Sequence, residues 1–138
     1  MIVPALMRLR AIKIMPTSTG ATTMTGYTVM TGTTSLGDVL VNVSSMTVYT
    51  FTNDTADMSN CNDTCAQTWI PVTVTEGIVP VAAPGIIGTL GVITRTDGTY
   101  QVTFNDMPLY TYSQDSQPGD VKGQGVGNRW YVVPVNQP

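Results

Sequence analysis

The chain has 138 residues, of which 42% are apolar and only 11% are charged, and it contains two cysteines and no histidine. A chain of this length can bury about two-thirds of its unfolded surface, which is enough for one self-supporting domain. The lack of histidine excludes Ser-His-Asp and Cys-His nucleophile pairs and histidine-ligated zinc, and two cysteines cannot form a four-thiolate metal site. Six basic residues against nine acidic ones give no basic surface for a nucleic-acid backbone.

The first residues of the chain form a basic arm in front of an acidic body. Three of the six cations, Arg8, Arg10 and Lys13, lie in the first thirteen residues, which contain no acid. Residues 7–15 alternate apolar and cationic side chains with one slip of phase, which predicts a strand with a bulge. Because Thr- and Gly-rich residues follow, we expect an extended arm and linker over residues 1–36. No uninterrupted apolar run precedes the cations, so we expect no signal peptide here.

Residues 37–138 show the periodicity of short strands. Alternating apolar residues predict one hairpin within residues 39–51 and a second within residues 91–104, where the Asp97-Gly98 pair favours a two-residue type I′ turn. Residues 78–93 are apolar but interrupted by Pro and Gly, which predicts a buried crossing loop rather than a membrane-spanning helix. Because no long segment has helical apolar spacing, we expect a mainly β domain.

An internal repeat organises this domain. A shift of 61 positions aligns residues 39–72 with residues 100–133 without a gap. Each unit is a hairpin followed by about seventeen residues that end in tryptophan. We therefore predict a single all-β domain, sandwich or barrel-like, in which two duplicated hairpin-plus-loop units pack with pseudo-twofold symmetry. The identical pairs are Val41/Val102, Met46/Met107, Tyr49/Tyr110, Thr50/Thr111, Asp54/Asp115, Trp69/Trp130 and Val72/Val133.

Both units contain the motif Tyr-x-aromatic-x-x-Asp, in residues 49–54 and 110–115. The cysteine pair precedes the first tryptophan, a Thr-Arg-Thr-Asp-Gly segment occupies residues 94–98, and the Gly-rich residues 119–127 precede the second tryptophan. Over about residues 40–133, these features resemble the secreted-repeat lipoprotein family, whose function is unassigned. The resemblance implies a protein that is secreted or lipid-anchored at a bacterial or archaeal surface, although no lipobox cysteine is present to support an anchor.

In the extracellular setting that this resemblance implies, Cys61 and Cys65 are expected to form a disulfide that staples the first loop. A redox-active or metal-binding pair is the alternative, but no histidine, second cysteine pair or nearby cation supports it. The equivalent positions of the second unit are Lys122 and Val126, where several glycines are expected to let the chain turn without a covalent bond.

The repeated aromatic residues have two interpretations. They form either the core between two packed units, which we favour, or a platform that binds a ligand. Asp54 and Asp115 follow the strand ends, where we expect them to cap turns rather than to catalyse hydrolysis. The aromatic residues concerned are Tyr49, Phe51, Trp69, Tyr110, Tyr112 and Trp130.

Polar side chains gather in the first loop, where Asp54, Asp57 and Asp63 are weak calcium candidates. No EF-hand spacing is present, and Asp and Asn also cap turns, which is the interpretation we favour. We expect no cofactor. Three asparagines begin glycosylation sequons, which matter only in a host that glycosylates: Asn42, Asn53 and Asn62.

These observations lead to a functional hypothesis of a non-enzymatic, extracellular or cell-surface structural protein from a prokaryote. We expect homo-oligomers, rings or filaments, in which the basic arm of one copy adds as a strand to the acidic body of the next. The alternative is a monomeric secreted module that binds a small ligand or a metal ion between the two repeats. The arm residues assigned to the contact are Arg8, Leu9, Arg10, Ile12, Lys13 and Ile14.

Overall fold

The computed structural model describes residues 26–135, and the predicted arm strand over residues 7–15 lies outside this range. The described chain consists mainly of short strands, with one short α-helix and one 3-10 turn. In chain order the elements are β1 (Val29–Thr34), β2 (Gly37–Asn42), β3 (Val48–Phe51), α1 (Thr64–Thr68), β4 (Trp69–Pro71), β5 (Thr73–Val74), β6 (Leu90–Thr94), β7 (Tyr100–Phe104), β8 (Met107–Pro108), β9 (Tyr110–Tyr112), η2 (Val126–Asn128) and β10 (Trp130–Val132).

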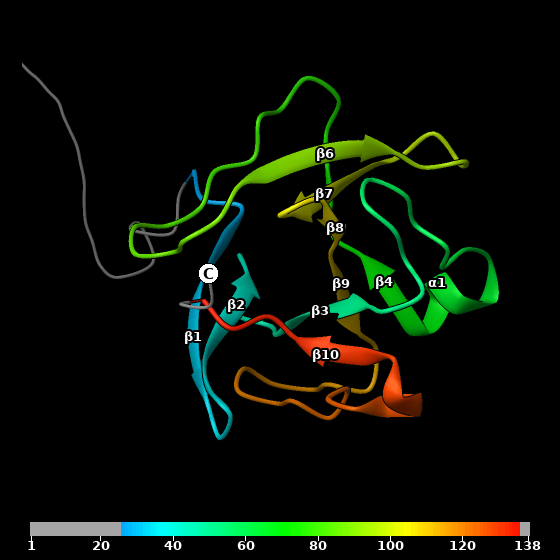
Figure 1. Cartoon of the computed structure of the whole chain (residues 1–138). Coiled ribbons are helices and arrows are strands. Elements are labelled where there is room, and N and C mark those ends of the chain that lie inside the picture. Colours follow the sequence, from blue (N-terminus) through cyan, green and yellow to red (C-terminus); the bar gives the residue numbers. More distant parts are fainter. Residues whose placement is uncertain (1–25, 136–138) are drawn as a thin grey trace, which may run out of the picture.

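The strands pair antiparallel in three sheets (Figure 1). The first sheet contains β1 and β2, and the second contains β10, β3, β9 and β4 in that order. The third contains β5, β7 and β6, with β8 also paired to β7. The prediction of an all-β domain is confirmed, and the described sheets stay open rather than closing into a barrel.

The second sheet relates the two repeats by a pseudo-twofold axis. Tyr49 on β3 lies directly opposite Tyr110 on β9, and these two residues occupy the same position of the two repeats. The axis therefore passes between the two central strands, and the duplication seen in the sequence is also a symmetry of the fold. The outer strands follow the same rule, each pairing a tryptophan with the second aromatic residue of the opposite motif: Trp69 with Tyr112, and Trp130 with Phe51.

β1 lies in the segment that the sequence predicted to be a linker. It pairs with β2 along its whole length, from Val29 opposite Asn42 to Thr34 opposite Gly37. Val29 is fully buried. The remaining residues of β1 are mostly Thr and Gly, which give too little apolar alternation to predict a strand. Pairing with β2 and burial of one end determine this strand, so the first repeat begins before residue 39.

The second hairpin turns over three residues instead of the two of the predicted type I′ turn. The Arg95 N–H donates to the Thr99 carbonyl at 2.8 Å, and the Gly98 N–H donates to the Arg95 carbonyl at 2.9 Å. Gly98 has a φ of +88°, the left-handed conformation that follows a type I turn in a three-residue hairpin loop. The predicted turn type is therefore wrong, whereas the hairpin itself is present.

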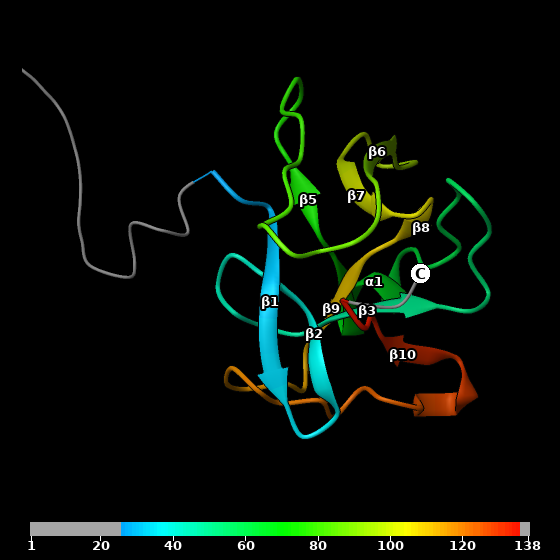
Figure 2. The same ribbon diagram turned by 60° about the vertical axis from the view of Figure 1, so that its left-hand side comes forward.

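Two large clusters of buried side chains hold the sheets together. The first part of the connection between β5 and β6 rises above β5 (Figure 2), and its later part returns to β1, where the Ala83 N–H donates to the Val29 carbonyl. None of residues 75–89 is buried, so the prediction of a buried crossing loop is wrong. The first cluster is aliphatic apart from one phenylalanine: Val29, Leu40, Val48, Val102, Phe104, Leu109, Val133 and Val135. The second is mainly aromatic and lies between the repeats: Tyr49, Phe51, Cys61, Trp69, Tyr110 and Trp130.

Candidate functional site

The repeated aromatic side chains stack across the pseudo-twofold axis. The indole rings of Trp69 and Trp130 have centroids 3.8 Å apart and planes inclined by 1°. Phe51 stacks on Trp130 at 4.1 Å, and Tyr112 stacks on Trp69 at 4.0 Å. Rings at these separations are in contact, which leaves no room for a ligand between them. The stack therefore acts as the core between the repeats, the interpretation favoured from the sequence.

The first and last residues of each motif connect the two repeats. The Tyr49 hydroxyl donates to Asp115 Oδ2 at 2.7 Å, and the Tyr110 hydroxyl donates to Asp54 Oδ2 at 2.7 Å. Each tyrosine therefore bonds to the aspartate of the other repeat, a pairing that the sequence did not predict. The second oxygen of each carboxylate accepts a backbone N–H of its own loop, from Asn60 at Asp54 and from Lys122 at Asp115.

Burial shifts the pKa values of both tyrosines and of Asp54. It raises the pKa of Tyr110 to about 12 and the pKa of Tyr49 still further, and the hydrogen bond to the opposite aspartate adds to both shifts. Burial also raises the pKa of Asp54, against the opposing effects of its hydrogen bonds and of Arg95. Both phenols thus stay protonated donors at neutral pH. This arrangement suits hydrogen bonds that hold the two repeats together better than it suits a general base, whose pKa should lie near the working pH.

Arg95 ties the first loop to the second hairpin. It lies in the Thr-Arg-Thr-Asp-Gly segment noted in the sequence, but no role was predicted for it. Its side chain is only 6% exposed. At the equivalent position the first repeat has Thr34, so this contact exists once. Because a buried cation needs hydrogen-bond partners, it holds the loop in place. The Arg95 guanidinium donates to Ser59 Oγ at 2.9 Å, Gln101 Oε1 at 2.8 Å, the Cys61 carbonyl at 2.7 Å and Asn62 Oδ1 at 3.0 Å.

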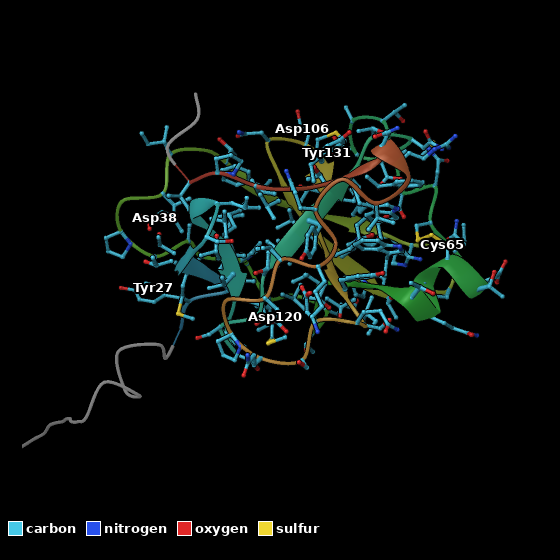
Figure 3. All side chains as sticks on the ribbon, turned by 90° about the horizontal axis from the view of Figure 1, so that it is seen from below. Tyr27, Asp38, Cys65, Asp106, Asp120 and Tyr131 are labelled. Atoms are coloured by element: carbon cyan, nitrogen blue, oxygen red, sulfur yellow. A yellow bond between two sulfur atoms is a disulfide. The ribbon has the colours of Figure 1, made fainter. Side chains whose placement is uncertain are left out.

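The predicted disulfide is present between Cys61 and Cys65. Cys61 is fully buried in the aromatic cluster, and Cys65 lies in α1. Figure 3 places Cys65 on the opposite side of the molecule from Tyr27, which lies two residues before the start of β1. The disulfide therefore belongs to the loop that Arg95 holds and is remote from the chain segment that leads to the arm.

Replacement of both cysteines by alanine is expected to lower the free energy of unfolding by about 2 kcal/mol, because the bond closes a short loop in the unfolded chain. Urea denaturation followed by circular dichroism measures this loss. The unmodified chain in reducing buffer is the matched control and is expected to give the same value. An unchanged free energy of unfolding in both samples would contradict a stapling role.

The three calcium candidates are not gathered into one cluster in the part of the chain that the structure describes. The Asp54 carboxylate is already bonded to Tyr110 and to the Asn60 N–H. Asp57 and Asp63 have positive φ angles of 59° and 55°, as Asp can have in turns. Within residues 26–135, no group of three or more His, Cys, Asp or Glu side chains is placed to hold a metal ion.

The three sequon asparagines differ in their surroundings. Asn53 is exposed on the first loop. The side-chain oxygen of Asn42 accepts the Ser44 and Met46 N–H groups at 2.9 and 3.0 Å, and that of Asn62 accepts Arg95. Of the three, Asn53 is the side chain that a modifying enzyme could reach without breaking these contacts.

An apolar groove of about 440 Å³ lies beside β4 and β5. One wall is formed by residues 26–28, directly before β1, and the other by residues 70–74. Val43 and Ile78 also line it, and each is 53% exposed. Because β5 is an edge strand of its sheet, the groove borders backbone groups that no strand within residues 26–135 pairs with. Its walls come from separate segments of the chain, so no local sequence pattern predicted it.

A family model described as a secreted repeat of unknown function matches residues 30–73 and 91–134. The two matches are 61 positions apart, which is the shift of the internal repeat, and together they cover more than half of the chain. Comparisons with curated proteins and with solved structures found no match. The helices between residues 26 and 135 are too short and too polar to cross a membrane.

Proposed function

The chain belongs to this family of secreted repeats of unknown function, and we propose that it is a non-enzymatic structural protein outside the cell whose copies assemble head to tail. The basic N-terminal arm of one copy docks on the acidic body of the next. The observation that carries this proposal is the apolar groove beside β4 and β5, which borders an open sheet edge. An extended segment can add as a further strand to a sheet edge that lies beside exposed apolar surface.

Charge supports the pairing of arm and body. All nine acidic residues lie within residues 26–135, together with three of the six cations, so this part carries a formal charge of −6 against +3 for the arm. Of the three cations of the body, Arg95 is buried, Lys122 lies 3.8 Å from Asp120 and Arg129 is exposed, so acidic side chains outnumber accessible cations on the body. Opposite net charges speed the encounter of arm and body and orient it.

Chain length supports docking between copies. Gly26 lines the groove, so the arm joins the body at the rim of the groove itself. The ten residues from Pro16 to Thr25 span at most about 35 Å when extended, which lets residues 7–15 reach a neighbouring copy.

Deletion of residues 1–15 is expected to convert an assembled particle into a monomer, because it removes the docking segment and half of the cations. Multi-angle light scattering and electron microscopy check this outcome. The matched control keeps the arm but replaces Arg8, Arg10 and Lys13 by serine, and it should assemble more weakly than the unmodified chain. Particles of unchanged mass after the deletion would refute the proposal.

A further inference from the structure

We infer that the groove binds the arm of a second copy. One large apolar side chain of this arm occupies the position in the first repeat that corresponds to the position of the Phe104 ring in the second repeat. This inference rests on the proposed function and specifies it. It follows from a comparison of the two repeats, which share one plan but differ in how completely this region is packed.

In the second repeat the region is closed. Phe104 is 5% exposed and packs in the aliphatic cluster with Val133 and Val135, which are 8% and 2% exposed. The phenylalanine ring approaches Gly88 so closely that a Cβ at position 88 has no room. The glycine therefore makes space for the ring, which belongs to the same buried cluster as the two valines.

In the first repeat the same region is open. Leu90 lies opposite Phe104 in the β6–β7 ladder, and its counterpart Val29 lies opposite Asn42 in the β1–β2 ladder. The shift of 61 positions aligns Phe104 with Val43, which follows the last residue of β2, lines the groove and is 53% exposed. The Asn42 side chain bonds back to its own turn and does not replace a phenyl ring. Val72 and Val74, the counterparts of the two covered valines, are only partly buried.

The residues left uncovered are those that line the groove. Asn42, Val72 and Val74 all belong to its lining, as does Tyr27, the counterpart of Gly88. The groove is thus the incomplete first-repeat copy of a packed region. A large aliphatic or aromatic side chain fits there, because apolar walls gain stability when such a side chain displaces water.

The arm has the chemistry to supply this side chain. In residues 7–15 the apolar Leu9, Ile12 and Ile14 are interleaved with cations, so an extended arm can turn an apolar side chain into the groove while its charges face water. Glu76 lies in the chain between Val74 and Ile78, which both line the groove, and it offers the arm an opposite charge. β5 provides an edge for main-chain pairing.

The test uses full-length variants that fill or charge the groove. Val43→Phe is expected to reduce the particle mass to that of the 14.7 kDa monomer without changing the thermal midpoint, because Val43 is 53% exposed and lines the groove. Ile70→Lys should act in the same way, since it places a cation against the basic arm. Val92→Phe and Ile87→Lys are the matched controls, because both sites are exposed but outside the groove lining, and both should assemble normally.

The outcomes distinguish the claim that the arm binds in the groove from the claim that copies assemble through the arm. If deletion of residues 1–15 abolishes assembly while Val43→Phe and Ile70→Lys assemble normally, the arm docks elsewhere: the inference is overturned and the proposed function survives. If neither the deletion nor the groove variants change the particle mass, both fail. If the unmodified chain is a monomer whose arm amide NMR signals shift in Val43→Phe, the arm occupies its own groove, which overturns docking between copies.

Discussion

Replacement of either Trp69 or Trp130 by alanine is expected to lower the free energy of unfolding by about 3–5 kcal/mol, as for other large aromatic side chains lost from a core. Each indole is 5% exposed, stacks on the other at 3.8 Å and also stacks on the motif residue opposite it, Phe51 or Tyr112. Urea denaturation followed by circular dichroism gives the loss for each variant.

The pseudo-twofold symmetry makes this prediction more specific. The two single variants should lose similar amounts, because each tryptophan makes equivalent contacts from its own repeat. The double variant should lose less than the sum, since the two indoles contact each other and this contact is lost only once. Ile70→Ala, at the next position of β4 and 46% exposed, is the control and should cost about 1 kcal/mol or less. Equal losses at Trp69 and Ile70 would contradict a stacked core.

The sequence contains enough information to predict the duplication and the burial of its aromatic residues. The ungapped shift aligns Tyr49 with Tyr110, and the structure places these residues opposite each other in the ladder. The partner of each aspartate could not be predicted in the same way. A carboxylate at a strand end satisfies nearby N–H groups in most turns, and only the packing of two repeats brings the tyrosine of the other unit to 2.7 Å.

The contacts of Arg95 and the presence of the groove could not be predicted from local sequence patterns. Arg95 lies at the closing pair of the second turn. Its guanidinium is buried by a loop more than thirty residues away in the chain, where Ser59, Cys61 and Asn62 accept its hydrogen bonds. The ladder places Asn42, which lines the groove, where the second repeat has Phe104. The registers of the two hairpins differ because the first turn has two residues, Ser35 and Leu36, whereas the second has three.

The free energy of unfolding is expected to fall steeply as the pH rises from about 10 to about 12. Burial raises the pKa of Tyr110 from 10.0 to about 12 and raises that of Tyr49 further. Because the folded-state pKa lies above the unfolded one, the stability associated with each phenol is complete below pH 10 and is lost as the pH rises through this window. Each tyrosine contributes about 1.4 kcal/mol per pH unit, so the pair gives a slope of about 2.7 kcal/mol per unit.

Single phenylalanine variants test this origin of the alkaline transition. Tyr110→Phe should lose about 1–3 kcal/mol at neutral pH, because the buried Asp54 carboxylate is left without its hydroxyl donor, and should retain about half of the slope. Tyr49→Phe should behave in the same way through Asp115, and the double variant should lose the slope due to both. Urea denaturation at a series of pH values measures the slopes, while tyrosinate absorbance reports ionisation. If Tyr110→Phe keeps the full slope, ionisation of the buried Tyr110 does not cause the loss of stability at high pH.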